Sequence, residues 1–325
     1  MPLDLDKRRL LQAAALAAVS AAVPAWAAAG RAPLSARSTA EAATAGIDLT
    51  GRTIVVTGCT SGIGQETMRV LALRGAHVLG TARSLDKGRA ACAAVEGRAT
   101  PVVLDLADFD SVVACAEAIR ALRVPVDALV CNAGIVLGDL EQVRGLEKQF
   151  VVNHLGHHLL VRRLLGRVIL APQGRVVVLG SGDERNAPAG GIQFDDLSGR
   201  SWERRYSHSK LANGLFSLEL SRRLSGTRAT SNCVSPGHVR TNILRNVGNG
   251  YREDARTVAE GAATPSWLAA SPDVAGRTGG FWRDFAPAPQ SAHQQDLAMA
   301  ARLWAVSEDL LRDYLPRGGT ARTVG

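Results

Sequence analysis

Residues 52–64 read RTIVVTGCTSGIG, a short β-branched run that passes directly into a glycine cluster. The stretch Gln65 to Leu73 that follows has the apolar spacing of a helix. Glycines allow a sharp turn and bring backbone N–H groups against a pyrophosphate, and the N-terminus of the following helix adds partial positive charge. This order of strand, turn and helix predicts a dinucleotide-binding unit. Taken alone, the cluster is also compatible with a glycine-rich turn that holds no ligand.

Further apolar runs of strand length alternate with helical stretches such as Asp108 to Leu122. The runs are His77 to Thr81, Pro101 to Leu106, Asp127 to Cys131, Arg175 to Leu179 and Thr230 to Val234. Such alternation implies right-handed crossovers and an α/β fold with one doubly wound parallel sheet of about seven strands, covered by helices on both faces. We therefore expect a single Rossmann-fold domain at residues 50–316 and a C-terminal tail at 317–325.

The first 49 residues differ in composition from the rest of the chain. Lys7-Arg8-Arg9 precedes two leucines and an Ala-rich run that ends at Ala25-Trp26-Ala27-Ala28. A basic start, an apolar segment and a small-x-small end are typical of an export signal, here similar to a twin-arginine signal. We expect residues 1–27 to direct the chain to the periplasm; Sec export, or a cytoplasmic protein with an uncleaved helix, are the alternatives. Residues 28–49 read as a flexible linker.

Composition excludes several classes of protein. The chain is 46% hydrophobic and 21% charged, which is typical of a folded protein with a large core. Its net charge of +8 is spread over scattered arginine pairs without a run of like charges, so we expect no nucleic-acid partner. The apolar N-terminal run is too short to give the mature protein a stable membrane span. The sequence is compatible with a homo-oligomer as well as with a monomer.

The cysteines and histidines give no metal pattern. Five cysteines stand at wide spacings without a CxxC pair, which favours neither a zinc site nor a disulfide framework: Cys59, Cys92, Cys115, Cys131 and Cys233. Three histidines at helical spacing, His154, His157 and His158, have no acidic or cysteine partner nearby in sequence. We therefore expect no metal.

The end of the second predicted strand bears on the choice of nucleotide. Folds that bind NAD often place an acid there to accept from the ribose 2′-OH. Here the segment 80–84 reads GTARS and offers Arg83 instead. A guanidinium attracts a 2′-phosphate, so the sequence favours NADP(H), with NAD(H) as the alternative if Arg83 is a solvated loop residue.

Tyr206 and Lys210 open an apolar helical stretch and stand four residues apart. Positions i and i+4 share a helix face, so both side chains can point into one pocket. A nearby ammonium favours the phenolate and lowers the tyrosine pKa from about 10, which suits proton transfer near neutral pH. A YxxxK pattern alone is usually structural, and its meaning depends on the other motifs.

From Gly51 to Leu315 the sequence resembles the short-chain dehydrogenase/reductase family, whose motifs follow here in order. They are the glycine loop at 57–64, Asp105-Leu106, Asn132-Ala133-Gly134, Asn153, Ser181, Tyr206 with Lys210, and Pro236-Gly237 with Thr241. Segments 150–157 (FVVNHLGH) and 206–213 (YSHSKLAN) are similar to the branch that holds retinol dehydrogenases, WW-domain oxidoreductase and protochlorophyllide reductase. That branch mostly uses NADP(H).

The resemblance implies an oxidoreductase that interconverts an alcohol and an aldehyde or ketone by hydride transfer. Tyr206 would exchange a proton with the substrate oxygen, and Lys210 would lower its pKa and hold the nicotinamide ribose. Ser181 would stabilise the developing alkoxide, and Asn153 would anchor a water that relays protons. The implied cofactor contacts are Thr57, Gly58, Thr60, Ser61, Gly62, Ile63, Gly64, Arg83, Asp105, Leu106, Asn132, Ala133, Gly134, Tyr206, Lys210, Pro236, Gly237, Val239 and Thr241.

Two residues depart from the family's usual sequence, and two segments bear on the size and polarity of the substrate. Cys131 and Gly180 stand where the family more often has Asn and Ser. The segments 182–205 and 242–262, which bound the substrate in this family, are polar here, so we expect a small-molecule alcohol or carbonyl that is smaller or more polar than a retinoid. The alternative function is a catalytically silent nucleotide-binding interaction or sensor protein.

Overall fold

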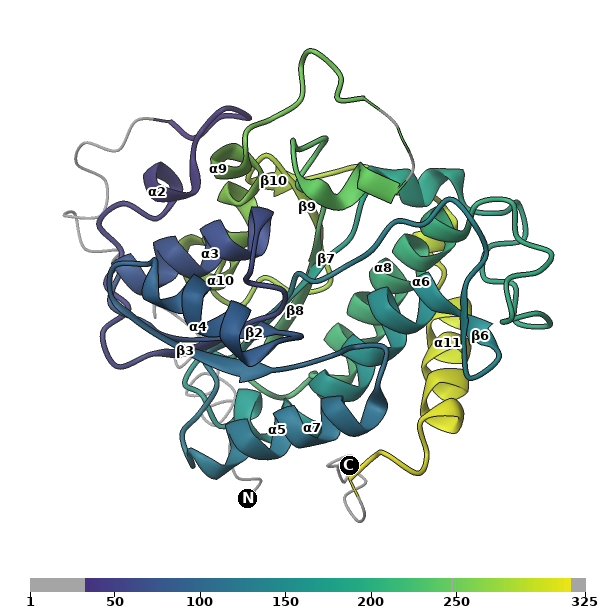
Figure 1. Cartoon of the computed structure of the whole chain (residues 1–325), viewed down its shortest axis with the longest axis horizontal. Helices are drawn as coiled ribbons and strands as arrows, with labels where there is room; N and C mark the ends of the chain where they lie inside the picture. Colours follow the sequence, from purple (N-terminus) through teal and green to yellow (C-terminus); the bar gives the residue numbers. More distant parts are fainter. Residues whose placement is uncertain (1–32, 247, 249, 317–325) are drawn as a thin grey trace, which may run out of the picture. The chain divides into compact units, whose positions relative to one another are not determined.

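The computed structural model describes residues 33–246, 248 and 250–316. The expected signal at 1–27 and the expected tail at 317–325 lie outside these residues. Within them, eight strands form one sheet in the order β10-β9-β8-β7-β4-β1-β2-β3 (Figure 1). The strands are β1 (Thr53–Val56), β2 (His77–Ala82), β3 (Arg98–Val103), β4 (Ala128–Cys131), β7 (Arg175–Leu179), β8 (Thr230–Val234), β9 (Phe281–Arg283) and β10 (Ala286–Pro287). Seven run parallel, and β10 pairs antiparallel with β9.

Helices connect the strands and cover the sheet. The longer ones are α3 (Gly62–Leu73), α4 (Leu85–Ala93), α5 (Phe109–Ala121), α7 (Gly156–Ile169), α8 (Arg205–Arg223), α10 (Ala263–Ala270) and α11 (Leu297–Leu310). Shorter elements are α2 (Ala40–Ala43), α6 (Lys148–Phe150), a π-helical turn η2 (Val151–Leu155), α9 (Val258–Gly261), the 3₁₀ turns η3 (Gly182–Asn186), η4 (Asn242–Asn246), η5 (Pro272–Val274) and η6 (His293–Gln295), and the hairpin strands β5 (Gln142–Val143) and β6 (Leu146–Glu147).

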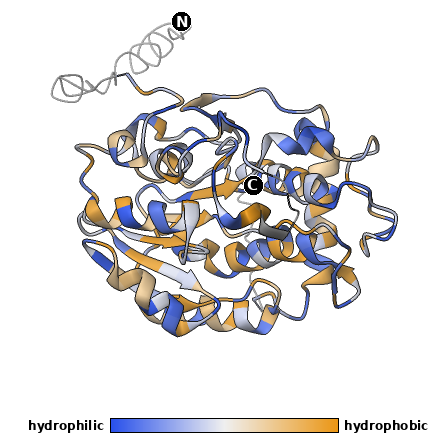
Figure 2. Ribbon diagram, turned by 45° about the horizontal axis from the view of Figure 1, so that its top comes forward, coloured by the Kyte–Doolittle hydropathy of each residue, from blue (hydrophilic) through white to orange (hydrophobic). Residues whose placement is uncertain are grey.

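Alternate residues of the central strands point to opposite faces of the sheet, and both faces are buried. In β1, Val55 packs with α5, α7, α8 and α11, whereas Ile54 and Val56 pack with α2, α3, α4 and α10. Figure 2 shows hydrophobic strands between helices that carry both hydrophobic and hydrophilic residues. A strand buried on both faces needs apolar side chains at every position, which explains the continuous β-branched runs in the sequence.

The strand order reverses between β1 and β4, because the chain adds β2 and β3 on one side and β7 to β9 on the other. In an open α/β sheet, this switch point leaves a crevice outside the carboxyl ends of the strands, where ligands bind. The expected fold class is confirmed. None of the described helices combines the length and the apolar character needed to span a membrane.

Two segments differ from the sequence-based expectation. Residues 34–49, expected to belong to a flexible linker, include α2 and bury Ala40, Ala43 and Leu49 against the core on the α10 side of the sheet. The helix is capped by Thr39, whose hydroxyl accepts from the N–H of Ala42. The third strand spans Arg98–Val103 rather than 101–106, because its pairing with β2 ends at Val103, opposite Ala82.

Candidate active site

The loop between β1 and α3 is fixed at its first residue. Thr57 is fully buried, and its hydroxyl oxygen accepts hydrogen bonds from the N–H groups of Asn132 and Ala133, both at 2.9 Å. The N–H of Cys59 donates to the Thr81 carbonyl at 2.9 Å. These bonds join the carboxyl ends of β1, β2 and β4 at the switch point.

Neighbouring atoms approach the glycines of this loop so closely that a side chain would clash there. Gly58 has φ +73°, and a Cβ there would lie 3.0 Å from the Ala133 Cβ; Gly64 would place a Cβ 2.3 Å from the Asn132 Nδ2. Gly62 has φ +61° and approaches the Thr241 side chain, 3.3 Å from an added Cβ. The loop therefore packs tightly on Asn132-Ala133 and reaches the segment after β8, which leaves backbone rather than side chains at the start of α3.

The start of α3 and the end of β2 suit an anionic nucleotide. Ser61 occupies the N-cap position of α3 without making a side-chain cap bond, so N–H groups of the first turn are available to a pyrophosphate. Arg83 is exposed just after β2 and makes no hydrogen bond or ion pair within the described part of the chain. Asp105 follows β3, and one of its carboxylate oxygens accepts from the N–H of Ala107 at 2.9 Å. These residues fit a dinucleotide, with Arg83 free for a 2′-phosphate.

Tyr206 and Lys210 lie on α8, one turn apart. The Lys210 Nζ lies 5.5 Å from the centre of the Tyr206 ring and donates to the Leu179 carbonyl at 3.0 Å. The Ser181 hydroxyl lies close enough to Tyr206 to lower the pKa of the phenol, and its Oγ accepts from the N–H of Asp183 at 3.1 Å. Ser181 follows β7, so the carboxyl end of this strand and the first turns of α8 bring the three side chains together.

Burial dominates the electrostatics of this group. It raises the pKa of Tyr206 above its ordinary value; the nearby Asp183 carboxylate acts in the same direction, and the Ser181 hydrogen bond opposes both. Burial also lowers the pKa of Lys210 to about 8. We expected from the sequence that Lys210 lowers the pKa of Tyr206. In the structure, desolvation of the phenol sets the direction of its pKa shift, and the Lys210 ammonium donates to the Leu179 carbonyl.

Asn153 lies in the π-helical turn η2 and is fully buried. Its side-chain oxygen accepts from the N–H of Ile135 at 2.8 Å, and its Nδ2 donates to the Ile135 carbonyl at 3.1 Å and to the Ser209 Oγ at 2.9 Å. The amide thus joins the segment after β4 to α8. These bonds hold the side chain in place, and the main-chain carbonyl of Asn153 offers a further acceptor.

Gly134 lies between Asn153 and Lys210. A Cβ added there would lie 3.3 Å from the Asn153 Oδ1 and 3.7 Å from the Lys210 Nζ. The structure therefore brings four expected residues, Gly134, Asn153, Tyr206 and Lys210, to one place at the crevice. Leu106 is different, because it is buried in the core and packs on Gly156. Val239 is also buried and packs on Gly261.

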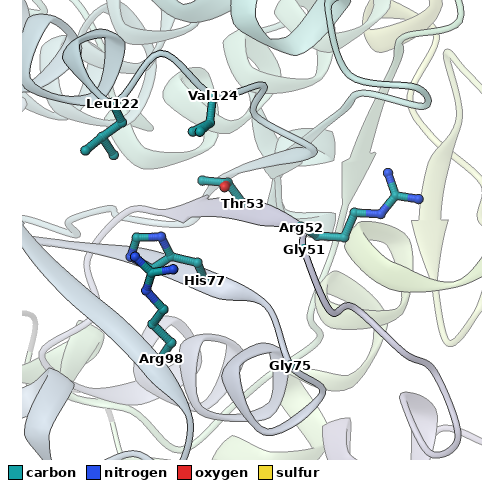
Figure 3. Close-up of a pocket in the computed structure, with 8 residues that line it drawn as sticks. All are labelled: Gly51, Arg52, Thr53, Gly75, His77, Arg98, Leu122 and Val124. Atoms are coloured by element: carbon teal, nitrogen blue, oxygen red, sulfur yellow. The ribbon is translucent and has the colours of Figure 1, made fainter.

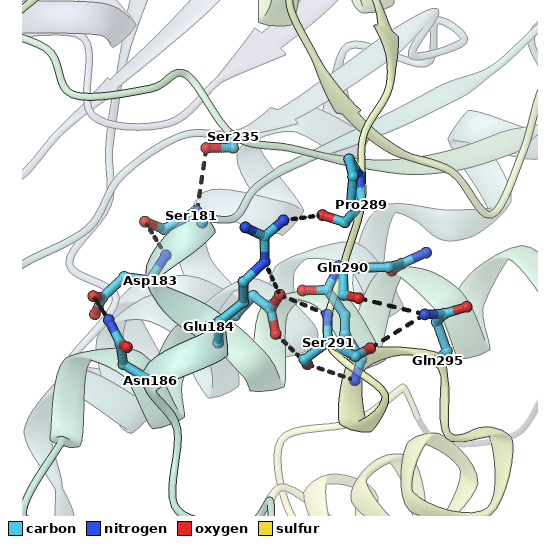
Figure 4. Close-up of polar contacts among 12 residues, drawn as sticks. Ser181, Asp183, Glu184, Asn186, Ser235, Pro289, Gln290, Ser291 and Gln295 are labelled. Atoms are coloured by element: carbon cyan, nitrogen blue, oxygen red, sulfur yellow. Dashed lines mark hydrogen bonds and ion pairs between the residues drawn. The ribbon is translucent and has the colours of Figure 1, made fainter.

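The loop that carries Ser181 is held from two sides (Figure 4). The Gly182 N–H donates to the Ser235 Oγ at 3.2 Å, just before Pro236-Gly237. The buried Glu184 carboxylate accepts from both the N–H, at 2.9 Å, and the hydroxyl of Ser291. Sequence reasoning missed Glu184, because its partner is 107 residues away and no local pattern marks the pair. We call this contact the Glu184–Ser291 clasp.

The family departure at Gly180 has a steric explanation. A Cβ at Gly180 would lie 2.5 Å from the Sγ of Cys233, which is buried in the neighbouring strand β8. The space that a serine side chain would need is therefore filled by the cysteine.

We expect Gly180→Ser to destabilise the protein by about 1–3 kcal/mol, since overpacking a tight core has this cost. The free energy of unfolding in urea would measure it. In a protein that already carries Cys233→Ala, adding Gly180→Ser should lower the free energy of unfolding much less, because the clashing Sγ is absent. An undiminished cost in the Cys233→Ala background would contradict the explanation.

Each of the three clustered histidines has a separate partner. His154 contacts the Ser307 Oγ at 2.8 Å, and His158 contacts the Glu308 carboxylate at 2.7 Å. His157 lies between Thr57 and Asn153. The rings thus point to different neighbours, and the described residues contain no group of three or more His, Cys, Asp or Glu side chains arranged to hold a metal.

A surface hollow of about 320 Å³ lies at the amino ends of three strands (Figure 3). Thr53, His77 and Arg98, which line it, are the first residues of β1, β2 and β3. Because the expected chemical groups follow the carboxyl ends of the strands, this hollow is separate from the candidate site.

Comparison with known proteins gives consistent matches. The family model "short chain dehydrogenase" matches residues 52–252. The chain is 37% identical to the WW domain-containing oxidoreductase of Pongo abelii over 83% of this chain and 70% of that protein. It is 36% identical to retinol dehydrogenase 12 of Bos taurus over 82% of this chain and 88% of that protein.

Solved structures show the same fold. An uncharacterized protein from Mycobacterium Paratuberculosis aligns with a TM-score of 0.70 and 34% identity over 84% of this chain and 98% of that chain. A short chain dehydrogenase from Escherichia coli CFT073, solved in complex with NADPH, aligns with a TM-score of 0.59 and 24% identity over 73% of this chain and 97% of that chain.

Proposed function

Since the chain belongs to the short-chain dehydrogenase family, whose members are oxidoreductases acting on CH–OH and C=O groups, we propose that it is an NADP(H)-dependent enzyme interconverting an alcohol and an aldehyde or ketone. The observation that carries the proposal is the convergence of Ser181, Tyr206 and Lys210 beside the glycine loop. The Ser181 hydroxyl acts on the pKa of the Tyr206 phenol, which supports assigning both hydroxyl groups to one reaction centre.

The residues have distinct roles in this proposal. When bound, the nicotinamide supplies or accepts the hydride. The Ser181 hydroxyl orients the substrate carbonyl and stabilises the charge that develops on its oxygen. Tyr206, whose raised pKa keeps the phenol protonated at neutral pH, donates its proton to that oxygen in the reductive direction. Lys210 holds the nicotinamide ribose, and its lowered pKa suits proton exchange near neutral pH.

Asn153 completes the set through its main chain. In the proposal, its main-chain carbonyl holds a water that returns protons from solvent to Lys210, while the side-chain amide is bonded to Ile135 and Ser209. The bonds of the Asn153 side chain to Ile135 and Ser209 support a role in holding the site together rather than direct contact with the substrate.

The decisive experiment is turnover by the purified mature chain. We expect loss of NADPH absorbance with members of an aldehyde and ketone panel, and a preference for compounds smaller or more polar than retinal, since the bounding loops are polar. NADPH binding without turnover of any compound would instead support the catalytically silent nucleotide-binding alternative.

Arg83 supports NADP(H) over NAD(H). We expect Arg83→Glu to weaken NADPH binding by about 10- to 100-fold and to leave NADH binding within about twofold, since a charge-assisted contact with the 2′-phosphate is replaced by repulsion. Fluorescence titration of the two nucleotides measures both constants. Arg120→Glu, an equal charge change on the exposed side of α5, is the control. Equal weakening of both nucleotides would contradict the assignment.

The localisation proposal rests on residues 1–27. We propose twin-arginine-like export to the periplasm with the cofactor loaded before export, because NADP(H) is a cytoplasmic nucleotide and this route carries folded proteins. Cell fractionation followed by N-terminal sequencing tests the route. Mature protein recovered from the periplasm without bound nucleotide would contradict the loading step.

A further inference from the structure

His157 makes two hydrogen bonds that join the cofactor loop to the catalytic region. The ring is 1% exposed, in the first turn of α7. Its Nε2 lies 2.9 Å from the Thr57 Oγ1, and its Nδ1 lies 3.1 Å from the Asn153 carbonyl oxygen. Thr57 is the first residue of the glycine loop, and the Asn153 carbonyl is the atom to which the proposed function assigns a water.

The partners decide which nitrogen carries the proton. A carbonyl can only accept, so the Nδ1 of His157 must be the protonated nitrogen that donates to Asn153. The Nε2 then has a lone pair and accepts the hydroxyl proton of Thr57. This assignment leaves the Thr57 oxygen free to accept from the N–H groups of Asn132 and Ala133, as observed. All donors and acceptors in this chain of bonds are satisfied.

The ring is held in the neutral form that this pattern requires. Burial lowers the pKa of His157 to about 4, the bond to the Asn153 carbonyl opposes this, and the Lys210 ammonium lowers the pKa further. At neutral pH, His157 therefore keeps one donor and one acceptor. A protonated ring would have two donors and could no longer accept from Thr57.

We propose that His157 is a positioning residue that ties the Asn153 carbonyl to Thr57, so that the cofactor loop and the catalytic centre fix each other's geometry. This inference rests on the proposed function. The two neighbouring histidines act differently: His154 on η2 and His158 on α7 bind Ser307 and Glu308 of α11. Of these three buried rings, His157 alone contacts the cofactor loop and Asn153.

The two bonds can be removed separately. In His157→Asn, the amide nitrogen can take the place of Nδ1 and keep the bond to Asn153, whereas it does not reach Thr57. In His157→Gln, the amide oxygen can take the place of Nε2 and keep the bond to Thr57. His157→Phe removes both bonds and retains a buried ring. His158→Phe, a change of the same kind on α7 outside the site, is the matched control.

We expect a different pattern for each variant. His157→Asn keeps kcat within about twofold but raises the Kd for NADPH by about tenfold, because Thr57 and its two backbone partners are released. His157→Gln keeps the Kd within about twofold but lowers kcat by about tenfold, because the Asn153 carbonyl is released. His157→Phe shows both losses, and His158→Phe shows neither. Parallel changes in kcat and Kd for His157→Asn and His157→Gln, or no change in either, would overturn the inference.

A spectroscopic readout separates this inference from the proposed function. The ¹⁵N resonances of His157, assigned by their loss in His157→Asn, should show a neutral ring protonated at Nδ1 at neutral pH. A ring protonated at Nε2 would overturn the inference even in an active enzyme. If the wild-type protein turned over no substrate, the proposed function would fail, and the tautomer together with the NADPH affinities would still decide the role of His157.

Discussion

Tyr206→Phe is expected to lower kcat/KM for carbonyl reduction by about 10³-fold or more while the Kd for NADPH changes by less than about threefold. The substitution removes the hydroxyl that donates the proton and leaves the ring in place. Because the Ser181 hydroxyl acts on the pKa of the phenol, the change also removes this interaction. Steady-state kinetics with the preferred carbonyl, together with fluorescence titration of NADPH, measures the two effects.

Tyr314→Phe provides the matched control. Tyr314 packs on Phe109 and Arg144, neither of which is among the expected site residues. It should retain full kcat/KM. Wild-type activity in Tyr206→Phe would exclude Tyr206 as the proton donor, whereas loss of NADPH binding would mean that the substitution had disturbed the site as a whole.

The second large effect is loss of stability in acid, caused by buried neutral histidines. Burial lowers the pKa of His157 to about 4 and that of His208 to about 3. The pKa values of His154 and His158 are also lowered by burial. With an ordinary pKa of about 6.5, these side chains bind protons in the unfolded chain at pH values where the folded chain leaves them neutral. Stability is therefore fully present above about pH 6.5 and falls as the pH drops towards the folded-state values.

Between pH 7 and about pH 5, His157 and His208 should each reduce the free energy of unfolding by about 2 kcal/mol, or about 4 kcal/mol together. Urea unfolding over this pH range measures the slope. His208→Phe keeps a ring stacked on Trp202. Near pH 5 it should reduce by about one the number of protons taken up on unfolding, which the slope of unfolding free energy against pH reports, even if it lowers stability at pH 7. A slope unchanged by His208→Phe would contradict this account.

The part of the candidate site that local spacing predicts consists of contacts close together in the sequence. The glycine loop and the pair Tyr206 and Lys210 are set by spacing within one turn or one helix, and the structure places them at the same crevice. The predicted lowering of the Tyr206 pKa is wrong, because burial of the phenol raises it and depends on packing contributed by distant segments.

Other features depend on partners far apart in the chain. Nothing local distinguishes His157 from His154 or His158, since the three share a helical pattern and differ in which distant side chain each ring meets. The packing of residues 34–49 was missed for a related reason. Small side chains such as Ala40 and Ala43 give a weak hydrophobic pattern, although α10 provides a surface on which they are buried.

The Glu184–Ser291 clasp has a consequence for the order in which the protein is made. Ser181 and Glu184 are synthesised more than 100 residues before Ser291. The Glu184 carboxylate can therefore bind Ser291 only after that residue has left the ribosome. The contact that holds the Ser181 loop from this side therefore forms only when translation is almost finished.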